Sequence, residues 1–169
     1  DGGGPDLSPP LGIPSESNLR APALLPSDYC SDVHERLTLY KRLANCDSEE
    51  ELLLLQEELI DRFGELPDQA RTLLETHRLR ILAKPLGLAK IDATEAVIKL
   101  QFIPMLTTEP PIDPARIIQL VQQDRRWKLA GPDRLSVARE TATLPERAAA
   151  IREIISLLNQ PVSPSKKQS

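Results

Sequence analysis

The sequence predicts an α+β domain in which three helices come first and a β-β-α-β-β-α segment follows. Between residues 32 and 84, apolar residues recur every three or four positions, which is typical of helices packed on a core. After residue 88 the pattern changes to short alternating or β-branched runs, which are typical of strands. Helices and strands in separate parts of a chain favour helices that cover one face of a small, mainly antiparallel sheet.

Length and charge exclude several classes of protein. The 169 residues suffice for one globular domain with unstructured ends. The formal net charge of -4 argues against a general electrostatic attraction to nucleic acid. The longest apolar run, the leucines at 52–55, is too short to cross a bilayer, and no signal peptide is evident. Cys30 and Cys46 lack CxxC spacing and indicate reduced thiols, so we expect a cytoplasmic protein without membrane contact.

Glycine and proline mark the expected domain boundaries. Four of the 7 glycines and six of the 16 prolines lie before residue 27. We therefore expect a flexible linker over 1–18 and a single domain over 19–158. The polar, proline-broken residues 159–169 are expected to form a disordered tail. Because the chain starts at Asp1 without a methionine, it is expected to be a piece of a longer protein.

Capping residues delimit the first two expected helices. Asp32, with Glu35 three residues later, predicts the start of the first helix. Its expected apolar stripe is Val33, Leu37, Tyr40 and Ala44. Ser48 and Glu51 repeat the capping spacing for the second helix, which is expected to stop at Gly64.

The remaining elements follow from prolines and from alternation of apolar residues. The third helix begins near Pro67 and should kink or end near Pro85. An Asp-Pro pair, typical of an N-cap and first turn, opens a later helix. The other expected elements, in order, are strands 89–93 and 96–102, a proline-rich loop 104–111, a helix from Asp113-Pro114, strands 127–129 and 135–138, and a helix from Pro145 to Leu158.

No catalytic constellation stands out in the sequence. There is no phosphate-binding loop and no GxGxxG motif. His34 and His77 do not combine with other residues into metal-ligand spacing, and neither cysteine has a base beside it. We therefore expect no catalytic residue, no metal and no cofactor, and an enzymatic role has the least support.

The second helix carries the most informative surface. Projected at 100° per residue, it has an apolar arc expected in the core, made of Leu52, Leu53, Leu55, Leu59, Ile60 and Phe63. The opposite arc is acidic and has a leucine at its centre; its members are Glu50, Leu54, Glu57, Glu58 and Asp61. Glu57 and Asp61, at i and i+4, repel each other without an offsetting base on that arc.

A leucine ringed by carboxylates is typical of a partner-binding patch. We predict that Leu54, Glu57, Glu58 and Asp61 bind a surface that presents arginines beside an apolar residue. The alternative is an acidic face that serves solubility alone.

A basic cluster on the third helix allows a second hypothesis, that of a nucleic-acid-binding accessory domain. Its members are Arg71, Arg78, Arg80 and Lys84. Nucleic-acid binders usually add aromatic stacking or a groove-entering motif, but aromatic residues make up only 3% of this chain. A solvated, salt-bridged helix face is therefore the favoured interpretation of this cluster.

Long segments of the three helices resemble a known family. They read LLPSDY at 24–29, DVHERLTLYKRLA at 32–44, ELIDRFGELP at 58–67 and ARTLL at 70–74. Together they resemble the C-terminal domain of bacterial transcription-repair coupling factors over residues 19–158. Pro85 departs from the family pattern, so the end of the third helix is expected to differ from that of the family.

The resemblance implies a non-catalytic, regulatory domain of an ATP-driven DNA translocase, joined to it by a flexible linker. That translocase displaces stalled RNA polymerase and recruits nucleotide-excision repair, and it contacts DNA through a motor outside this chain. The domain would dock on a UvrB-like module, mask the surface that binds UvrA and restrain the motor, as an autoinhibitory clamp. Acids of the family's docking helix match Glu58 and Asp61. Leu54 and Glu57 are inferred from helix periodicity only.

Overall fold

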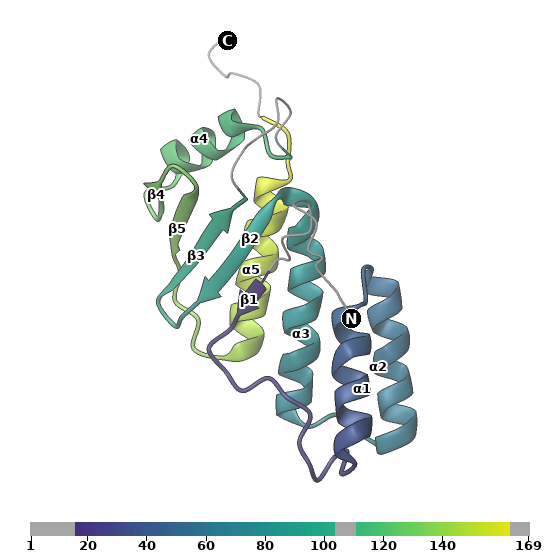
Figure 1. The fold of residues 1–169 in the computed structure, drawn as a ribbon. Helices are drawn as coiled ribbons and strands as arrows, with labels where there is room; N and C mark the ends of the chain where they lie inside the picture. Colours follow the sequence, from purple (N-terminus) through teal and green to yellow (C-terminus); the bar gives the residue numbers. More distant parts are fainter. Residues whose placement is uncertain (1–15, 104–110, 163–169) are drawn as a thin grey trace.

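A computed structural model describes residues 16–103 and 111–162 and has the predicted α+β architecture (Figure 1). The helices are α1 (Val33–Ala44), α2 (Glu49–Phe63), α3 (Asp68–Ala83), the short 3₁₀ helix η2 (Lys84–Leu86), α4 (Pro114–Gln123) and α5 (Leu144–Leu158). The strands are β1 (Glu16–Asn18), β2 (Leu88–Ala93), β3 (Val97–Phe102), β4 (Trp127–Gly131) and β5 (Arg134–Ala138). The predictions of a linker before residue 16, a loop over 104–110 and a tail beyond 162 lie outside the described residues.

The five strands form one sheet in the order β1-β2-β3-β5-β4. The two hairpins, β2–β3 and β4–β5, and the central β3–β5 pair are antiparallel, as predicted. The exception is β1, which pairs with β2 in parallel, with Glu16 opposite Lys90 and Asn18 opposite Asp92. Residues 16–18, which the sequence analysis places in the linker, therefore belong to the sheet edge.

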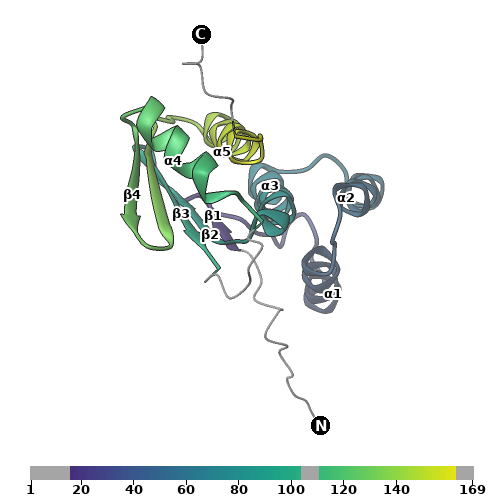
Figure 2. The same cartoon turned by 90° about the horizontal axis from the view of Figure 1, so that it is seen from above.

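Three helices cover one face of this sheet. Figure 2 shows α3, α4 and α5 on the same side of the strands, and the buried side chains of the strands lie on that side. This core includes Leu88, Ile91, Ile98, Leu100 and Leu135 from the strands and Leu79 and Ile151 from α3 and α5. Burial of each leucine or isoleucine stabilises the fold by about 1.5–3 kcal/mol.

A second core lies on the other side of α3. There α1 and α2 pack against α3 and away from the sheet (Figure 1). Leu43, Leu52 and Leu59 are fully buried in this core, and Ala70 and Leu74 of α3 complete it. Because α3 is lined with apolar residues on both sides, it joins the helical unit to the sheet.

The predicted caps are present. Asp32 Oδ1 accepts a hydrogen bond from the His34 amide at 3.0 Å, and Ser48 Oγ accepts one from the Glu51 amide at 3.1 Å. The third helix passes into the 3₁₀ turn that contains Pro85, which removes a backbone donor there, and Gly87 ends this turn with a φ of 73°.

The predicted apolar stripe of α1 is wrong. Val33 and Leu37 are exposed, whereas Leu39 and Leu43 are buried. Glu35 and Arg42 of α1 form ion pairs with α2, and this orientation turns Leu39 and Leu43 toward the core shared with α3. Of the predicted stripe, Val33, Leu37 and Ala44 face solvent, and Tyr40 alone is partly buried against this core.

The predicted apolar arc of α2 is too wide. Leu52, Leu55 and Leu59 are buried, as expected, but Leu53 and Ile60 are 48% and 42% exposed. Because α2 packs at the edge of the helical unit, its neighbours cover a narrower arc than its apolar residues span.

Candidate docking surface on α2

The packing of α2 determines which of its side chains reach solvent. Leu52, Leu55 and Leu59 anchor one side of the helix in the core, so the opposite side points outward. Leu54 is 66% exposed, and Glu57 is exposed beside it. We call the solvent-facing side the α2 outer face; it consists of Glu50, Leu53, Leu54, Glu57, Ile60 and Asp61.

The carboxylates of Glu57 and Asp61 are available to a partner. Both residues are exposed, and neither forms an ion pair or a side-chain hydrogen bond within residues 16–103 and 111–162. They lie one turn apart, so their negative charges reinforce each other on the α2 outer face. Sequence reasoning correctly placed both of them, together with Leu54, on the surface.

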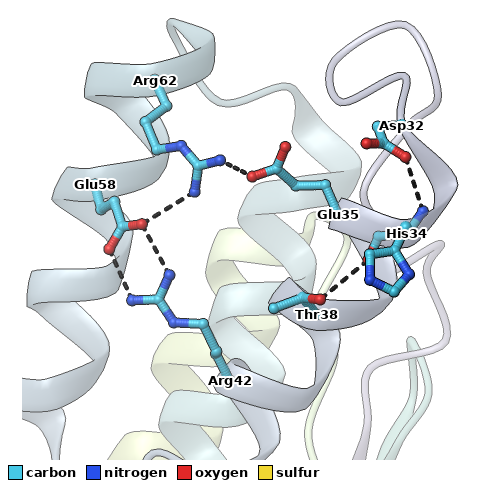
Figure 3. Close-up of polar contacts among 7 residues, drawn as sticks. All are labelled: Asp32, His34, Glu35, Thr38, Arg42, Glu58 and Arg62. Atoms are coloured by element: carbon cyan, nitrogen blue, oxygen red, sulfur yellow. Dashed lines mark hydrogen bonds and ion pairs between the residues drawn. The ribbon is translucent and has the colours of Figure 1, made fainter.

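Glu58 has different surroundings. Its carboxylate receives two hydrogen bonds from Arg42 of α1, from Nη2 to Oε1 at 2.7 Å and from Nη1 to Oε2 at 2.8 Å (Figure 3). Arg62, one turn further along α2, adds a contact to Oε2 at 3.1 Å. The hydrogen bonds from Arg42 lower the pKa of the Glu58 carboxyl.

These contacts form a network of alternating charges between α1 and α2. Arg62 pairs with Glu58 and also with Glu35 of α1, so the order is Arg42, Glu58, Arg62 and Glu35 (Figure 3). The Arg62 guanidinium also lies 4.9 Å from the ring centroid of Phe63. We call these four charged residues the α1–α2 charge network. Of the four predicted site residues, only Glu58 belongs to it.

Sequence reasoning missed the network because most of it is tertiary. The Glu58–Arg62 pair has i,i+4 spacing and was detectable on the helix projection. Arg42 lies 16 positions before Glu58, and that contact depends on how α1 packs against α2.

The alternative basic cluster on α3 is largely occupied within the domain. Arg71 pairs with Asp68, and Arg78 pairs with Glu75. Arg80 donates to the backbone carbonyls of Leu43 and Cys46 at 3.3 and 3.0 Å. Arg71 and Arg78 thus fit the salt-bridged interpretation, whereas Arg80 is half-buried against backbone carbonyls and Lys84 lies beyond α3, in η2.

The histidine, cysteine and carboxylate side chains that could bind a metal or react do not cluster in the described part of the chain. Within residues 16–103 and 111–162, no three His, Cys, Asp or Glu side chains are grouped as a metal site would need. Cys30 and Cys46 are buried and unpaired with each other, and burial raises the pKa of the Cys46 thiol. In the same described ranges, none of the helices has the length and hydropathy to cross a membrane.

Fold and surface together define a class: an α+β domain with a helical unit joined to a helix-covered sheet, and with its candidate site on an outer helix. The chain belongs to the family of C-terminal domains of transcription-repair coupling factors, and the profile of the TRCF domain matches residues 19–112. The transcription-repair-coupling factor of Escherichia coli K12 is 39% identical over 147 residues, or 86% of this chain. That of Haemophilus influenzae is 43% identical over 110 residues, or 65% of this chain.

A solved structure has the same fold. The crystal structure of the C-terminal domain of a transcription-repair coupling factor matches with a TM-score of 0.65 and 23% sequence identity. The match covers 86% of this chain and 94% of that one. This chain spans only 12% of the length of the E. coli protein and 9% of the H. influenzae protein.

Proposed function

We propose that this chain is a non-catalytic regulatory domain of a transcription-repair coupling factor, acting in transcription-coupled nucleotide-excision repair. The α2 outer face docks on the UvrB-like module of the longer protein, masks the surface that would bind UvrA and restrains the DNA translocase. The carboxylates of Glu57 and Asp61 carry this proposal: they follow Leu54 on the α2 outer face, are exposed, and form no ion pair in the described part of the chain. Engagement of stalled RNA polymerase releases the clamp.

The composition of the α2 outer face supports a reversible contact. Leu53, Leu54 and Ile60 offer partly exposed apolar surface, and Glu57 and Asp61 add negative charge among them. A basic partner surface with an apolar centre would complement both features. Because the acids are exposed, salt screens their attraction, so docking is expected to weaken at high ionic strength.

Glu58 contributes to docking in combination with its neighbours. Arg42 and Arg62 neutralise much of its charge but leave its side chain 34% exposed. A partner arginine therefore meets stronger unpaired negative charge at Asp61 than at Glu58. The α1–α2 charge network holds Glu58 and the helix that carries the α2 outer face in a defined position.

Charge reversal tests the proposal. The double variant Glu58→Arg/Asp61→Arg should bind the separately produced UvrB-like module at least tenfold more weakly in isothermal titration calorimetry. Its circular dichroism spectrum should match that of the unchanged chain. The matched control is Glu95→Arg/Glu140→Arg, which reverses two exposed acids near the strands and should leave the affinity within about twofold. Equal affinity of the test variant and the unchanged chain rejects α2 as the docking element.

A further inference from the structure

The face of the sheet opposite the helices is uncovered by the described part of the chain (Figure 2). The strand registers show which side chains lie on it, because alternate residues of a strand point to opposite faces. Ile91, Leu100 and Leu135 point into the core, so their neighbours point to the open side. The polar residues of this open face are Glu16, Asn18, Lys90, Asp92, Lys99, Gln101, Lys128, Arg134 and Ser136.

Four of these residues are cations, one on each of four neighbouring strands. Lys90 lies on β2, Lys99 on β3, Arg134 on β5 and Lys128 on β4. Lys99 and Lys128 share a row through their common partner Ser136, whereas Lys90 and Arg134 share the next row through Gln101. The cations thus form a zigzag across the sheet with steps of about 7–8 Å between diagonal neighbours. We call these four residues the sheet-face cation row.

The charges of the sheet-face cation row are not paired in salt bridges within the described part of the chain. All four side chains are exposed, and none forms a salt bridge within residues 16–103 and 111–162. Asp92, opposite Lys99 on the same face, is held by Arg20 through hydrogen bonds of 2.7 and 2.6 Å, and this contact, with smaller contributions from Lys99 and Lys90, lowers the pKa of its carboxyl. The remaining acid, Glu16, lies opposite Lys90 at the sheet edge. The open face is therefore cationic although the whole chain has a net charge of -4.

The other side chains on this face suit phosphate better than a protein surface. Its apolar residues among those described are limited to Val97, Ala130 and Ala138, so it lacks the large anchor that protein interfaces usually bury. Gln101 and Ser136 lie between the cations and line a shallow hollow of about 380 Å³ together with Lys90, Lys99, Arg134 and the Arg20-bound Asp92. Lysine, arginine, serine and glutamine are the side chains that hydrogen-bond phosphate oxygens in protein–DNA complexes.

We propose that the sheet-face cation row binds the phosphate backbone of double-stranded DNA without sequence preference. The face has no aromatic side chain among its described residues, so it offers no platform for stacking the bases of a single strand. This inference concerns a surface separate from α2 and uses none of the α3 cluster. Its failure would therefore leave the proposed docking function unaffected.

Salt dependence gives a quantitative expectation. Each neutralised phosphate of a duplex contributes about -0.9 to the slope of log K against log salt concentration. Four contacts predict a slope of about -3.6, and each lysine removed should reduce its magnitude by about 1.

The experiment measures fluorescence anisotropy of a labelled 20-base-pair duplex titrated with the whole chain at several salt concentrations. Lys90→Gln/Lys99→Gln should weaken binding at least tenfold at low salt and reduce the slope by about 2. The matched control Lys41→Gln/Arg125→Gln removes the same charge from two exposed cations, one on α1 and one after α4, and should change binding by less than twofold. Circular dichroism verifies that both variants fold.

Three results would overturn the proposal. One is the absence of an anisotropy change at low salt. Another is equal weakening by the test and control variants, which would indicate a general response to net charge. The third is competition by single-stranded DNA or polyglutamate at least as strong as that by unlabelled duplex, which would assign the face to another polyanion.

Discussion

Glu58 and Asp61 lie one turn apart on α2, yet their surroundings differ. Glu58 is bound by Arg42 and Arg62, whereas Asp61 is exposed without an ion pair in the described part of the chain. An exposed ion pair contributes about 0.2–1 kcal/mol to folding, and an unpaired surface acid contributes almost nothing. The two residues should therefore respond differently to neutralisation.

We predict that Glu58→Gln lowers the free energy of unfolding by up to about 1 kcal/mol, because it weakens the α1–α2 charge network. Asp61→Asn should leave this free energy within about 0.5 kcal/mol of its original value but should weaken docking more than Glu58→Gln does. Urea unfolding and titration with the UvrB-like module measure the two effects. The reverse ranking in docking would show that Glu58 is the main charge presented to the partner.

His77 should make folding stability sensitive to mild acid. Burial, with a smaller contribution from Arg80, lowers the pKa of His77 from 6.5 to about 4. As the pH falls below 6.5, the unfolded chain takes up a proton before the folded one does, so stability is highest above this pH. Because solvent screens part of this effect at the half-buried ring, the free energy of unfolding should fall by about 1–2 kcal/mol between pH 7 and pH 5.

Urea unfolding at both pH values tests this prediction. The variant His77→Gln keeps an acceptor for Arg80, whose Nε donates to His77 Nδ1 at 3.3 Å, but it cannot take up the proton. Its free energy of unfolding should change much less over this range. An equal decline in the variant and the unchanged chain would assign the pH dependence to other groups.

At the scale of elements, Arg147 ties α5 to the start of the domain. This buried guanidinium donates to the carbonyl of Leu19 at 2.7 Å and to the hydroxyl and carbonyl of Thr141 at 3.1 and 2.9 Å. Leu19 directly follows β1, so the contact holds the parallel edge strand near the N-terminus of α5.

Arg147→Met should lower the free energy of unfolding by about 2–3 kcal/mol, because it leaves buried acceptors without a donor. The same change at the exposed Arg125, which makes no ion pair in the described residues, should cost less than about 0.5 kcal/mol. Urea unfolding compares the two variants, and hydrogen exchange should show faster exchange in β1 for Arg147→Met. Equal stability of the two variants would contradict a role for Arg147 in holding β1.

Capping residues and local periodicity predicted where helices and strands lie in the sequence better than they predicted which side of each helix is buried. Asp32, Ser48 and Gly64 act within one helical turn, so the ends of α1 and α2 are visible in the sequence. The predicted rotation of α1 about its axis was wrong because the helix has two apolar stripes. Contacts with α2 and α3 bury the stripe that contains Leu39 and Leu43. The strand β1 was missed because three residues carry too little periodicity to indicate a strand.

At the scale of the whole molecule, the fold places an acidic surface and a basic surface in different regions, which the net charge of -4 does not reveal. The acids of the α2 outer face lie in the helical unit on one side of α3, and the sheet-face cation row lies beyond the sheet on the other (Figures 1 and 2). The two proposed binding surfaces therefore carry opposite charge and lie apart from each other. The docking and DNA-binding experiments test these surfaces independently.

The sequence by itself determined the α+β class, the order of the helices and strands from α1 to α5, and the exposure of Leu54, Glu57 and Asp61, because caps and periodicity act over a few residues. Only the tertiary structure decided that Arg42 binds Glu58 and that cations from four strands share one face. Those contacts join positions from 16 to several tens of residues apart, and they depend on helix packing and strand register.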